Sequence, residues 1–308
     1  MGRHDPGDVM ATGVPVIVVD EGGFPVTPVE SGGPLMTVAT NGIGAPITLT
    51  DNGAPCVVQG LFDPAAVALF DAWDTAGAPA DGARQTLVNN TIVALKAAGI
   101  WDELDLLYFT AAHAAAAAHN NWKSPSTFTL TPTAAPAFVA NRGYTGNGTT
   151  SYLGTGYIPS TNGVKWLQSD ASVWSWSVTD VASTSPDAGA GVTYVGAVNP
   201  RSATNTIDAQ LNRATTALTA AMASSVGMSG VARSAGPSEH IWKNGVSVAA
   251  GTAGPSGRPT GEFLLCGRTP SSFSTRQVAF AAAGSACAGK ELAFYNAVRA
   301  YMTGVGVP

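Results

Sequence analysis

The acidic side chains of the second half of the chain are the residues whose type could support hydrolytic chemistry. Hydrolysis of a glycosidic bond needs two carboxyl groups that face each other across one sugar ring. From residue 122 onward the acids stand singly, and no Glu-x-Asp-x-x-Glu string places several of them on one face of a strand. These acids are Asp170, Asp180, Asp187, Asp208, Glu239, Glu262 and Glu291. The sequence therefore predicts a protein that is not an enzyme, and a polysaccharide depolymerase is kept as an alternative.

Metal and thiol chemistry lack clear sequence signals. His113 and His119 are six residues apart in a run expected to be helical, so they lie about 240° apart around the axis. The three cysteines are odd in number and widely spaced, which predicts partly buried thiols and no disulfide framework. The stretch 187–191 carries two glycines of a dinucleotide fingerprint without the third. We therefore expect no metal and no cofactor.

Sugar binding needs less than hydrolysis: an exposed aromatic ring and a few polar groups on loops. The candidates for carbohydrate binding are Trp166, Tyr194, Asn199, Arg201 and Asn205. By contrast, Trp174 and Trp176 alternate with serine along a predicted strand, which places both indoles in the core. The oxygens of Asn199, Asn205 and Asp208 are too sparse to predict a calcium site. A binding surface on loops is the chemistry that the sequence favours.

The elements that would position these residues fall into three segments, and the first covers residues 1–60. It holds five copies of Gly-x-Pro followed by an apolar residue, nine to twelve residues apart. Glycine and proline favour a turn, and β-branched runs such as 16–19 and 47–50 predict a short strand after it. Strands this short do not form a core alone. The segment is predicted to be an anchor and oligomerisation segment of β-repeats, with a flexible linker as the alternative.

Residues 61–121 change to helical periodicity. The pair Asp63-Pro64 predicts an N-cap and first helical residue, and a second helix is expected over 82–98 with Gly99 just after its end. A third helix is expected to begin near Trp101 and to continue through the alanine-rich run 111–118. The predicted buried faces hold Ala66, Leu69, Phe70, Trp73, Val88, Ile92 and Leu95. This segment is predicted to be a small helical neck module.

Residues 122–308 show the pattern of an all-β domain, with many short strands between turns rich in glycine, proline and serine. The stretch 241–248 carries Asn244-Gly245 between two apolar runs, which predicts a hairpin with a type I′ turn. Further strands are expected over 192–195 and 262–267, and a closing helix over about 288–301. That helix is predicted to present Leu292, Tyr295, Val298 and Met302 to the core. The predicted fold class is mainly β with a helical insert.

The low charge of the chain excludes several partners. Charged residues make up 11% of the sequence, the formal net charge is −5, and no block of like charge occurs. Nucleic-acid surfaces need a stripe of Lys and Arg, and anionic membranes attract the same kind of stripe. The first eight residues lack an apolar run, which predicts no secretory signal. We therefore expect no nucleic-acid partner and no membrane insertion.

Several segments carry a resemblance to known architectures. The stretch 142–153 resembles the opening of a concanavalin A-like (laminin-G-like) jelly roll. The later stretches 231–233, 243–246, 263–267 and 289–298 fit the same domain. The run 95–108, continued by His113, Ala117 and Asn121-Trp122, is similar to a helical module of tailed-phage and gene-transfer-agent fibre proteins.

This resemblance implies a virion head spike or tail fibre, made in the bacterial cytoplasm and assembled into the particle. The N-terminal segment would attach it to other capsid or tail proteins and associate with its own copies, as a trimer or another ring. The C-terminal jelly roll would contact host surface polysaccharide. A purely structural decoration protein without glycan binding is the main alternative, because the jelly roll also serves as an inert spacer.

Overall fold

The computed structural model describes residues 62–214, 217–268 and 271–308, together with the backbone of four short strands nearer the N-terminus. The chain divides into two units, Met1–Phe62 and Asp63–Pro308. In the first unit β1 (Val18–Val19) pairs antiparallel with β2 (Pro25–Val26), and β3 (Thr48–Asp51) with β4 (Ala54–Val57). These strands fall among the Gly-x-Pro copies. The rest of the repeat segment, and its predicted anchor role, lie outside the described residues.

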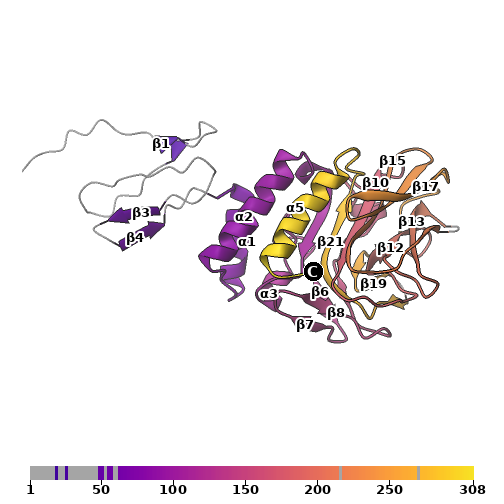
Figure 1. The fold of residues 1–308 in the computed structure, drawn as a ribbon, viewed down its shortest axis with the longest axis horizontal. Coiled ribbons are helices and arrows are strands. Elements are labelled where there is room, and N and C mark those ends of the chain that lie inside the picture. The colour runs from indigo at the N-terminus through magenta and orange to yellow at the C-terminus, as the bar shows by residue number, and fades with distance from the viewer. Residues whose placement is uncertain are drawn as a thin grey trace, which may run out of the picture. The chain divides into compact units, whose positions relative to one another are not determined.

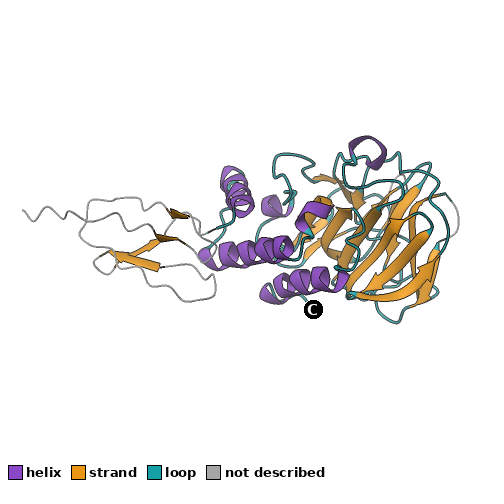
Figure 2. Cartoon of the chain, turned by 90° about the horizontal axis from the view of Figure 1, so that it is seen from above, coloured by secondary structure: helices purple, strands orange, loops and turns teal. Residues whose placement is uncertain are grey.

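Two antiparallel sheets pack against each other in the second unit (Figures 1 and 2). One has the order β17 (Val246–Gly251), β16 (Ser238–Lys243), β15 (Gly227–Ala235), β10 (Ala171–Ser177), β21 (Gln277–Gly284), β8 (Gly143–Thr145) and β7 (Ala137–Val139), and β5 (Leu104–Phe109) also pairs with β21. The other has the order β14 (Leu218–Ala221), β13 (Thr206–Arg213), β12 (Val195–Asn199), β11 (Ala188–Ala190), β18 (Leu264–Leu265), β9 (Tyr152–Gly154) and β6 (Thr131–Thr133). A small hairpin joins β19 (Gly267–Arg268) and β20 (Ser272–Phe273). The predicted fold class, mainly β with a helical insert, is confirmed.

The first two predicted helices are confirmed. In α1 (Pro64–Thr75) the Asp63 carboxylate accepts a hydrogen bond from the Ala65 amide at 2.9 Å, and proline occupies the first turn. In α2 (Gly82–Ala97) the chain leaves the helix at Gly99, whose φ of +64° suits glycine. The predicted buried faces of both helices are buried. Shorter helices are η1 (Trp101–Glu103), α3 (Ala115–Ala118) and α4 (Pro159–Asn162).

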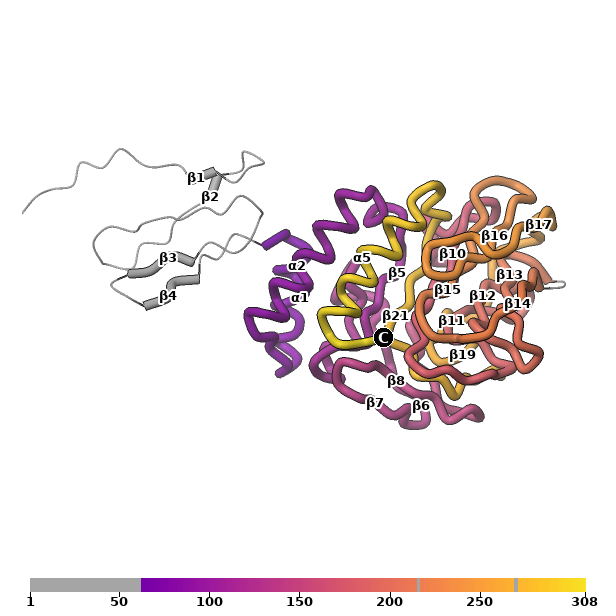
Figure 3. Tube along the Cα trace, in the orientation of Figure 1, coloured from indigo at the N-terminus to yellow at the C-terminus, as the bar shows by residue number. Residues whose placement is uncertain are grey.

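The predicted third helix is wrong. Residues 104–109 form β5, which pairs antiparallel with the second half of β21 (Figure 3). Of the alanine-rich run 111–118, only Ala115–Ala118 is helical. Residues 104–109 are buried along nearly their whole length, and hydrophobic periodicity cannot separate a short buried strand from a buried helix. The two strands pair closely because Gly284 has no Cβ. A Cβ at this position would lie 2.2 Å from the Glu103 carbonyl oxygen and would clash with it. The helical segment therefore contributes a strand to the sandwich.

The closing helix α5 (Glu291–Gly304) packs on β10 and β21. Trp174 and Trp176 of β10 are each 1% exposed, as predicted, and their rings contact Phe294 and Tyr295 of α5. The prediction that Leu292 faces the core is wrong, because Leu292 is 56% exposed, whereas Phe294 is buried. Figure 1 shows α5 beside α1 and α2, on the side of the sandwich formed by β21.

Three further predictions concern strands. The hairpin over 241–248 is confirmed: Lys243 pairs with Val246, and both turn residues, Asn244 and Gly245, have positive φ. The strand predicted over 192–195 begins only at Val195, as β12. The strand predicted over 262–267 is shorter, since β18 comprises Leu264–Leu265.

Candidate functional site

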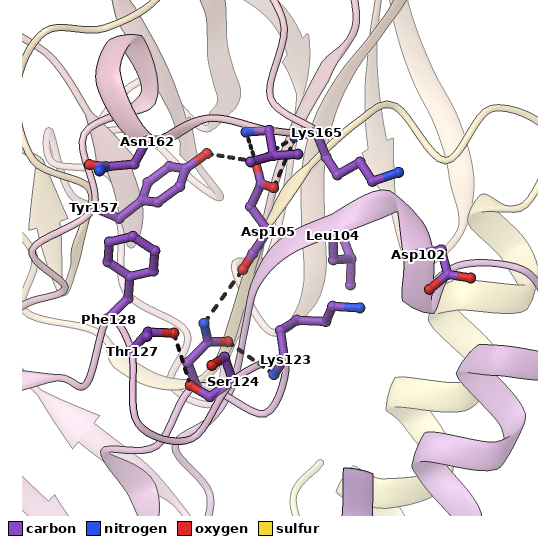
Figure 4. Close-up of a pocket in the computed structure, with 12 residues that line it drawn as sticks. Asp102, Leu104, Asp105, Lys123, Ser124, Thr127, Phe128, Tyr157, Asn162 and Lys165 are labelled. Carbon is purple, nitrogen blue, oxygen red and sulfur yellow. Dashed lines mark hydrogen bonds between the residues drawn. The ribbon is translucent and has the colours of Figure 1, made fainter. Parts of the chain in front are cut away.

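A pocket of about 650 Å³ opens where β5, the segment 121–128 and the segment 157–165 meet (Figure 4). Each segment contributes polar groups that could contact a ligand. The lining comprises Asp102, Leu104, Asp105, Asn121, Lys123, Ser124, Thr127, Phe128, Tyr157, Asn162, Val164 and Lys165. A pocket of this size, with aromatic walls and a few polar groups, has the dimensions of a small-ligand site.

Asp105 of β5 fixes one wall of the pocket. Its carboxylate accepts hydrogen bonds from three consecutive backbone amides, those of Val164 (3.2 Å), Lys165 (2.9 Å) and Trp166 (2.9 Å). It also accepts one from the Tyr157 hydroxyl at 2.7 Å, and burial together with this carboxylate raises the pKa of Tyr157 far above its usual value. Successive amides that converge on one anion form a stable nest. Asp105 is therefore a positioning residue that holds the segment 157–166 on β5.

Asn121 and Tyr108 fix the opposite wall. The Asn121 side-chain oxygen accepts from the backbone amides of Leu107 at 3.0 Å and Lys123 at 3.2 Å. The Tyr108 hydroxyl, which comes from β5, donates to the Phe128 carbonyl oxygen at 2.5 Å. Phe128 has a φ of +56°, a left-handed conformation that a bulky side chain rarely adopts. Strain of this kind persists where the surrounding structure enforces it, and it is common in binding loops.

Phe128 supplies an aromatic wall. Its ring meets that of Tyr157 edge-on, with 5.2 Å between ring centroids. Tyr157 is fully buried, whereas Phe128 is only partly buried and lines the pocket. Figure 4 shows the two rings together on one side of the pocket. Phe128 is therefore the aromatic surface that a ligand would meet.

Two lysines supply positive charge to the pocket. The half-buried Lys123 ammonium donates to the Trp101 carbonyl oxygen and lies 4.2 Å from the centroid of the Trp101 ring. Among the described residues no carboxylate lies within ion-pair distance of it. Burial lowers the pKa of Lys123 to about 8. Lys165 is exposed, and its ammonium makes no hydrogen bond or ion pair within the described parts of the chain.

The sequence-predicted candidates do not gather at this pocket. The prediction that Trp166 is exposed is wrong: it is fully buried and its indole donates to the Asn212 side-chain oxygen at 2.8 Å. Asn199 is 7% exposed, and its amide group bonds Arg276 and the Ser183 carbonyl oxygen. Buried groups with their partners already in place cannot present a surface to sugar. Trp166 and Asn199 are therefore not in a position to bind a sugar.

Arg201 and Asn205 do lie together, at a different place. The Arg201 guanidinium donates twice to the Asn205 side-chain oxygen, at 2.9 and 2.8 Å, and once to Asp180 at 3.0 Å. Tyr194 precedes the first residue of β12, whereas Arg201 follows its last, so the strand separates them. The structure thus pairs two of the five candidates. A sugar-binding role for Tyr194, Arg201 and Asn205 stays a prediction.

A fully buried ion pair lies next to that loop. Arg276 bonds the Asp187 carboxylate through Nε at 2.6 Å, and its other donors reach the Asn199 side chain and three carbonyl oxygens. Ser177 and Ser274 donate to the same carboxylate. All five donors of the guanidinium are in use. This cluster ties the loops before β11 and β21 together and has no group left for a ligand.

The segment Gly284–Lys290 fits the pattern Gly-x-x-x-x-Gly-Lys and lies between β21 and α5. Phosphate-binding loops continue with Ser or Thr, where this chain has Glu291. Its Lys290 ammonium bonds Glu103 at 3.0 Å and the Gly99 carbonyl oxygen at 2.8 Å. The amides of Ser285 and Ala286 donate to Glu103 and Asp170. The Lys290 ammonium and the first two amides of this segment are therefore engaged within the chain.

The histidines and helices carry no sign of a metal site or a membrane span in the described residues. Within the described residues, no group of three or more His, Cys, Asp or Glu side chains is arranged to hold a metal ion. His113 instead bonds the Ala78 carbonyl oxygen, and His119 bonds the Tyr144 hydroxyl. None of the helices in the described part of the chain has both the length and the apolar character needed to cross a bilayer.

Comparison with known proteins gives matches among solved structures alone, since no protein-family model and no curated protein matches the chain. A sialidase from Trypanosoma rangeli aligns at 12% identity and a TM-score of 0.44, over 69% of this chain and 38% of the sialidase. A mutant of that enzyme with trans-sialidase activity aligns at 11% and 0.46, over 70% and 40%. Domain 4 of AbnA, an extracellular arabinanase from Geobacillus stearothermophilus, in complex with arabinotriose, aligns at 11% and 0.35, over 62% and 97%.

These matches correct one prediction. The chain was predicted not to be an enzyme, and the solved structures that align with it are sialidases and a domain of an arabinanase, so that prediction is overturned. The chain spans about two fifths of the length of the sialidases. With TM-scores below 0.5, the alignments assign no activity to this chain.

Proposed function

We propose that residues 63–308 form a glycan-binding module of a virion spike or fibre, and that the pocket beside β5 is its sugar site. The observation that carries the proposal is the partly exposed Phe128 ring, held in a strained conformation in a pocket with polar walls. An aromatic ring can cover the apolar face of a sugar while nearby amide, hydroxyl and ammonium groups meet its hydroxyls. Phe128, Asn162, Thr127 and Lys123 supply these groups.

The spike or fibre assignment is supported by the segment that resembles phage and gene-transfer-agent proteins. That segment, residues 95–108, includes Asp102, Leu104 and Asp105, which line the pocket. The helical segment and the jelly roll therefore build the site together. In this proposal the Gly-x-Pro segment attaches the protein to the particle and to its own copies, and the second unit contacts host surface polysaccharide.

The test measures binding of the purified full chain to host cells before and after enzymatic removal of their surface polysaccharide. A fragment that begins at residue 122 is unsuitable, because it lacks β5, which pairs with β21 and contributes residues to the pocket. We expect binding that disappears on stripping and falls strongly in Phe128→Ala. Phe138→Ala is the matched control, because Phe138 is a partly buried aromatic on β7 that does not line the pocket.

Binding that survives stripping, or that Phe128→Ala leaves unchanged, contradicts the proposed site. Absence of binding to intact cells supports the decoration protein instead. Release of reducing ends is measured in the same incubation, because Asp102 and Asp105 both line the pocket. Loss of polymer together with loss of that activity in Asp102→Asn would identify a depolymerase.

A further inference from the structure

The charges of the pocket point to a class of sugar. We propose that the site selects acidic saccharides, with the carboxylate of a uronic or related sugar acid held between Lys123 and Lys165. This inference rests on the proposed function, since it names the ligand class of the same pocket.

The two carboxylates of the pocket differ in how far they can meet a ligand. The Asp105 oxygens accept hydrogen bonds from three backbone amides and the Tyr157 hydroxyl, so they are occupied within the fold. Asp102 is exposed, and Figure 4 places it at the edge of the lining, away from Phe128 and Tyr157. Neither carboxylate is paired with Lys123 or Lys165 within 4.0 Å. Within the described residues both ammonium groups therefore lack a carboxylate partner that a ligand would have to displace.

The two lysines come from opposite walls. Lys123 lies on the segment held by Asn121, and Lys165 on the segment held by Asp105. Figure 4 shows both side chains extending across the pocket to the side opposite the Phe128 and Tyr157 pair, where Asp102 also lies. A partly desolvated ammonium without a carboxylate partner is stabilised by binding an anion. A sugar acid offers a carboxylate for the lysines and a ring face for Phe128.

Neighbouring charged groups do not remove this preference. Around Lys123 the charged groups that act on it are Asp102 and Asp105, which favour its protonated form, and Lys96 and Lys165, which disfavour it. Lys96 is already paired with Asp63 at 2.6 Å. Burial is the largest influence and lowers the pKa of Lys123 to about 8. A bound carboxylate would raise this pKa again, so the two events are coupled.

The experiment titrates the full chain with oligogalacturonate, hyaluronan oligosaccharide and alginate oligosaccharide, each as the free acid and as its methyl ester. The ester keeps the sugar ring and removes the charge. We expect the free acid of at least one to bind and its ester to bind at least about tenfold more weakly. Lys123→Gln and Lys165→Gln should each remove that difference, whereas Arg142→Gln, which removes a cation outside the pocket, should not.

The outcomes separate this inference from the proposed function. Equal binding of acid and ester overturns the acid preference and leaves sugar binding intact. No binding of any probe by a protein that still binds polysaccharide on cells also overturns the acid preference. No binding of probes or cells overturns both proposals. Equally tight binding of polyglutamate shows general attraction to anions, and that result likewise overturns selection of a sugar acid.

Discussion

Arg276 and Lys123 are two cations that the fold removes from water, and it treats them in opposite ways. Arg276 is fully buried, and each of its five donors has a partner in the chain. Lys123 is half-buried beside a pocket, where its ammonium contacts the carbonyl oxygen and the ring of Trp101 and forms no ion pair with a carboxylate of the described residues. A buried cation with complete partners ties loops together, whereas an incompletely partnered one retains affinity for an anion.

The difference originates in the neighbouring segments. Around Arg276 the strands β10, β11, β12 and β21 end close together, so that carbonyl oxygens from several loops converge on one guanidinium. Around Lys123 the lining holds two carboxylates: Asp105 is occupied by the amides of residues 164–166, and Asp102 is exposed and forms no ion pair with Lys123. The first cluster is therefore expected to contribute to stability and the second to binding.

The largest expected effect is on stability. Asp187→Ala leaves Arg276 as an uncompensated charge in the core, and removal of one partner of a buried ion pair costs about 3–5 kcal/mol. Denaturant unfolding should show that loss in the free energy of unfolding. The double variant Asp187→Ala with Arg276→Met should lose less than the sum of the single variants, since it leaves no isolated charge. A loss below about 1 kcal/mol in Asp187→Ala would contradict a structural role for this ion pair.

Lys123→Gln should give the reverse pattern. We expect affinity for an acidic saccharide to fall at least about tenfold, which corresponds to about 1.4 kcal/mol. The free energy of unfolding should change by less than about 1 kcal/mol, because the ammonium makes one hydrogen bond to a carbonyl oxygen and no ion pair. Calorimetric titration and denaturant unfolding of the same sample check both halves. A large loss of stability without loss of binding would reverse the comparison.

The pH dependence sharpens the same comparison. Because the pKa of Lys123 in the folded chain is about 8, affinity for an acidic saccharide should fall as the pH rises from 7 to 9. Binding of the methyl ester should stay constant over that range. The unfolded chain keeps the proton up to its ordinary pKa near 10.4, so the contribution of this group to the free energy of unfolding rises with pH above 8. Affinity that rises with pH would contradict a protonated Lys123 as the anion partner.

The smallest expected effect belongs to the site that the sequence favoured. Arg201 is partly exposed, and its pair with Asp180 lies at the surface. Surface ion pairs contribute about 0–1 kcal/mol, so Arg201→Ala should change the free energy of unfolding little. Cell binding in the stripping assay should also persist if the pocket beside β5 is the sugar site. Loss of binding in this variant would move the site to Arg201 and Asn205.

Local sequence patterns predicted the local structure well. The Asp63-Pro64 start of α1, the Gly99 end of α2 and the Asn244-Gly245 turn each depend on conformations of a few adjacent residues. The alternation of Trp174 and Trp176 with serine predicted their shared face because side chains of a strand alternate regardless of its neighbours. These features follow from backbone geometry alone.

The errors concern residues whose environment is made by distant parts of the chain. The residues next to Trp166 in the sequence do not indicate that it is buried. It is fully buried in the fold because Asn212 and Phe263 contact it. The apolar composition of residues 104–109 is compatible with a helix or a strand, and pairing with β21 makes this segment a strand. No local pattern contains that information. For the pocket, the sequence carries one signal: a lysine and an aromatic residue, Lys123 and Phe128, lie near each other in a turn-rich segment.

The sequence by itself determined the three-part composition, the mainly β class, the ends of two helices and the type I′ hairpin, because each is written in neighbouring residues. Only the tertiary structure decided where the site lies. Asp105 contacts amides about sixty residues further along the chain, and Tyr108 contacts the loop of Phe128. The pocket exists because these long-range hydrogen bonds bring three separate segments together around two lysines whose charges the fold leaves unpaired.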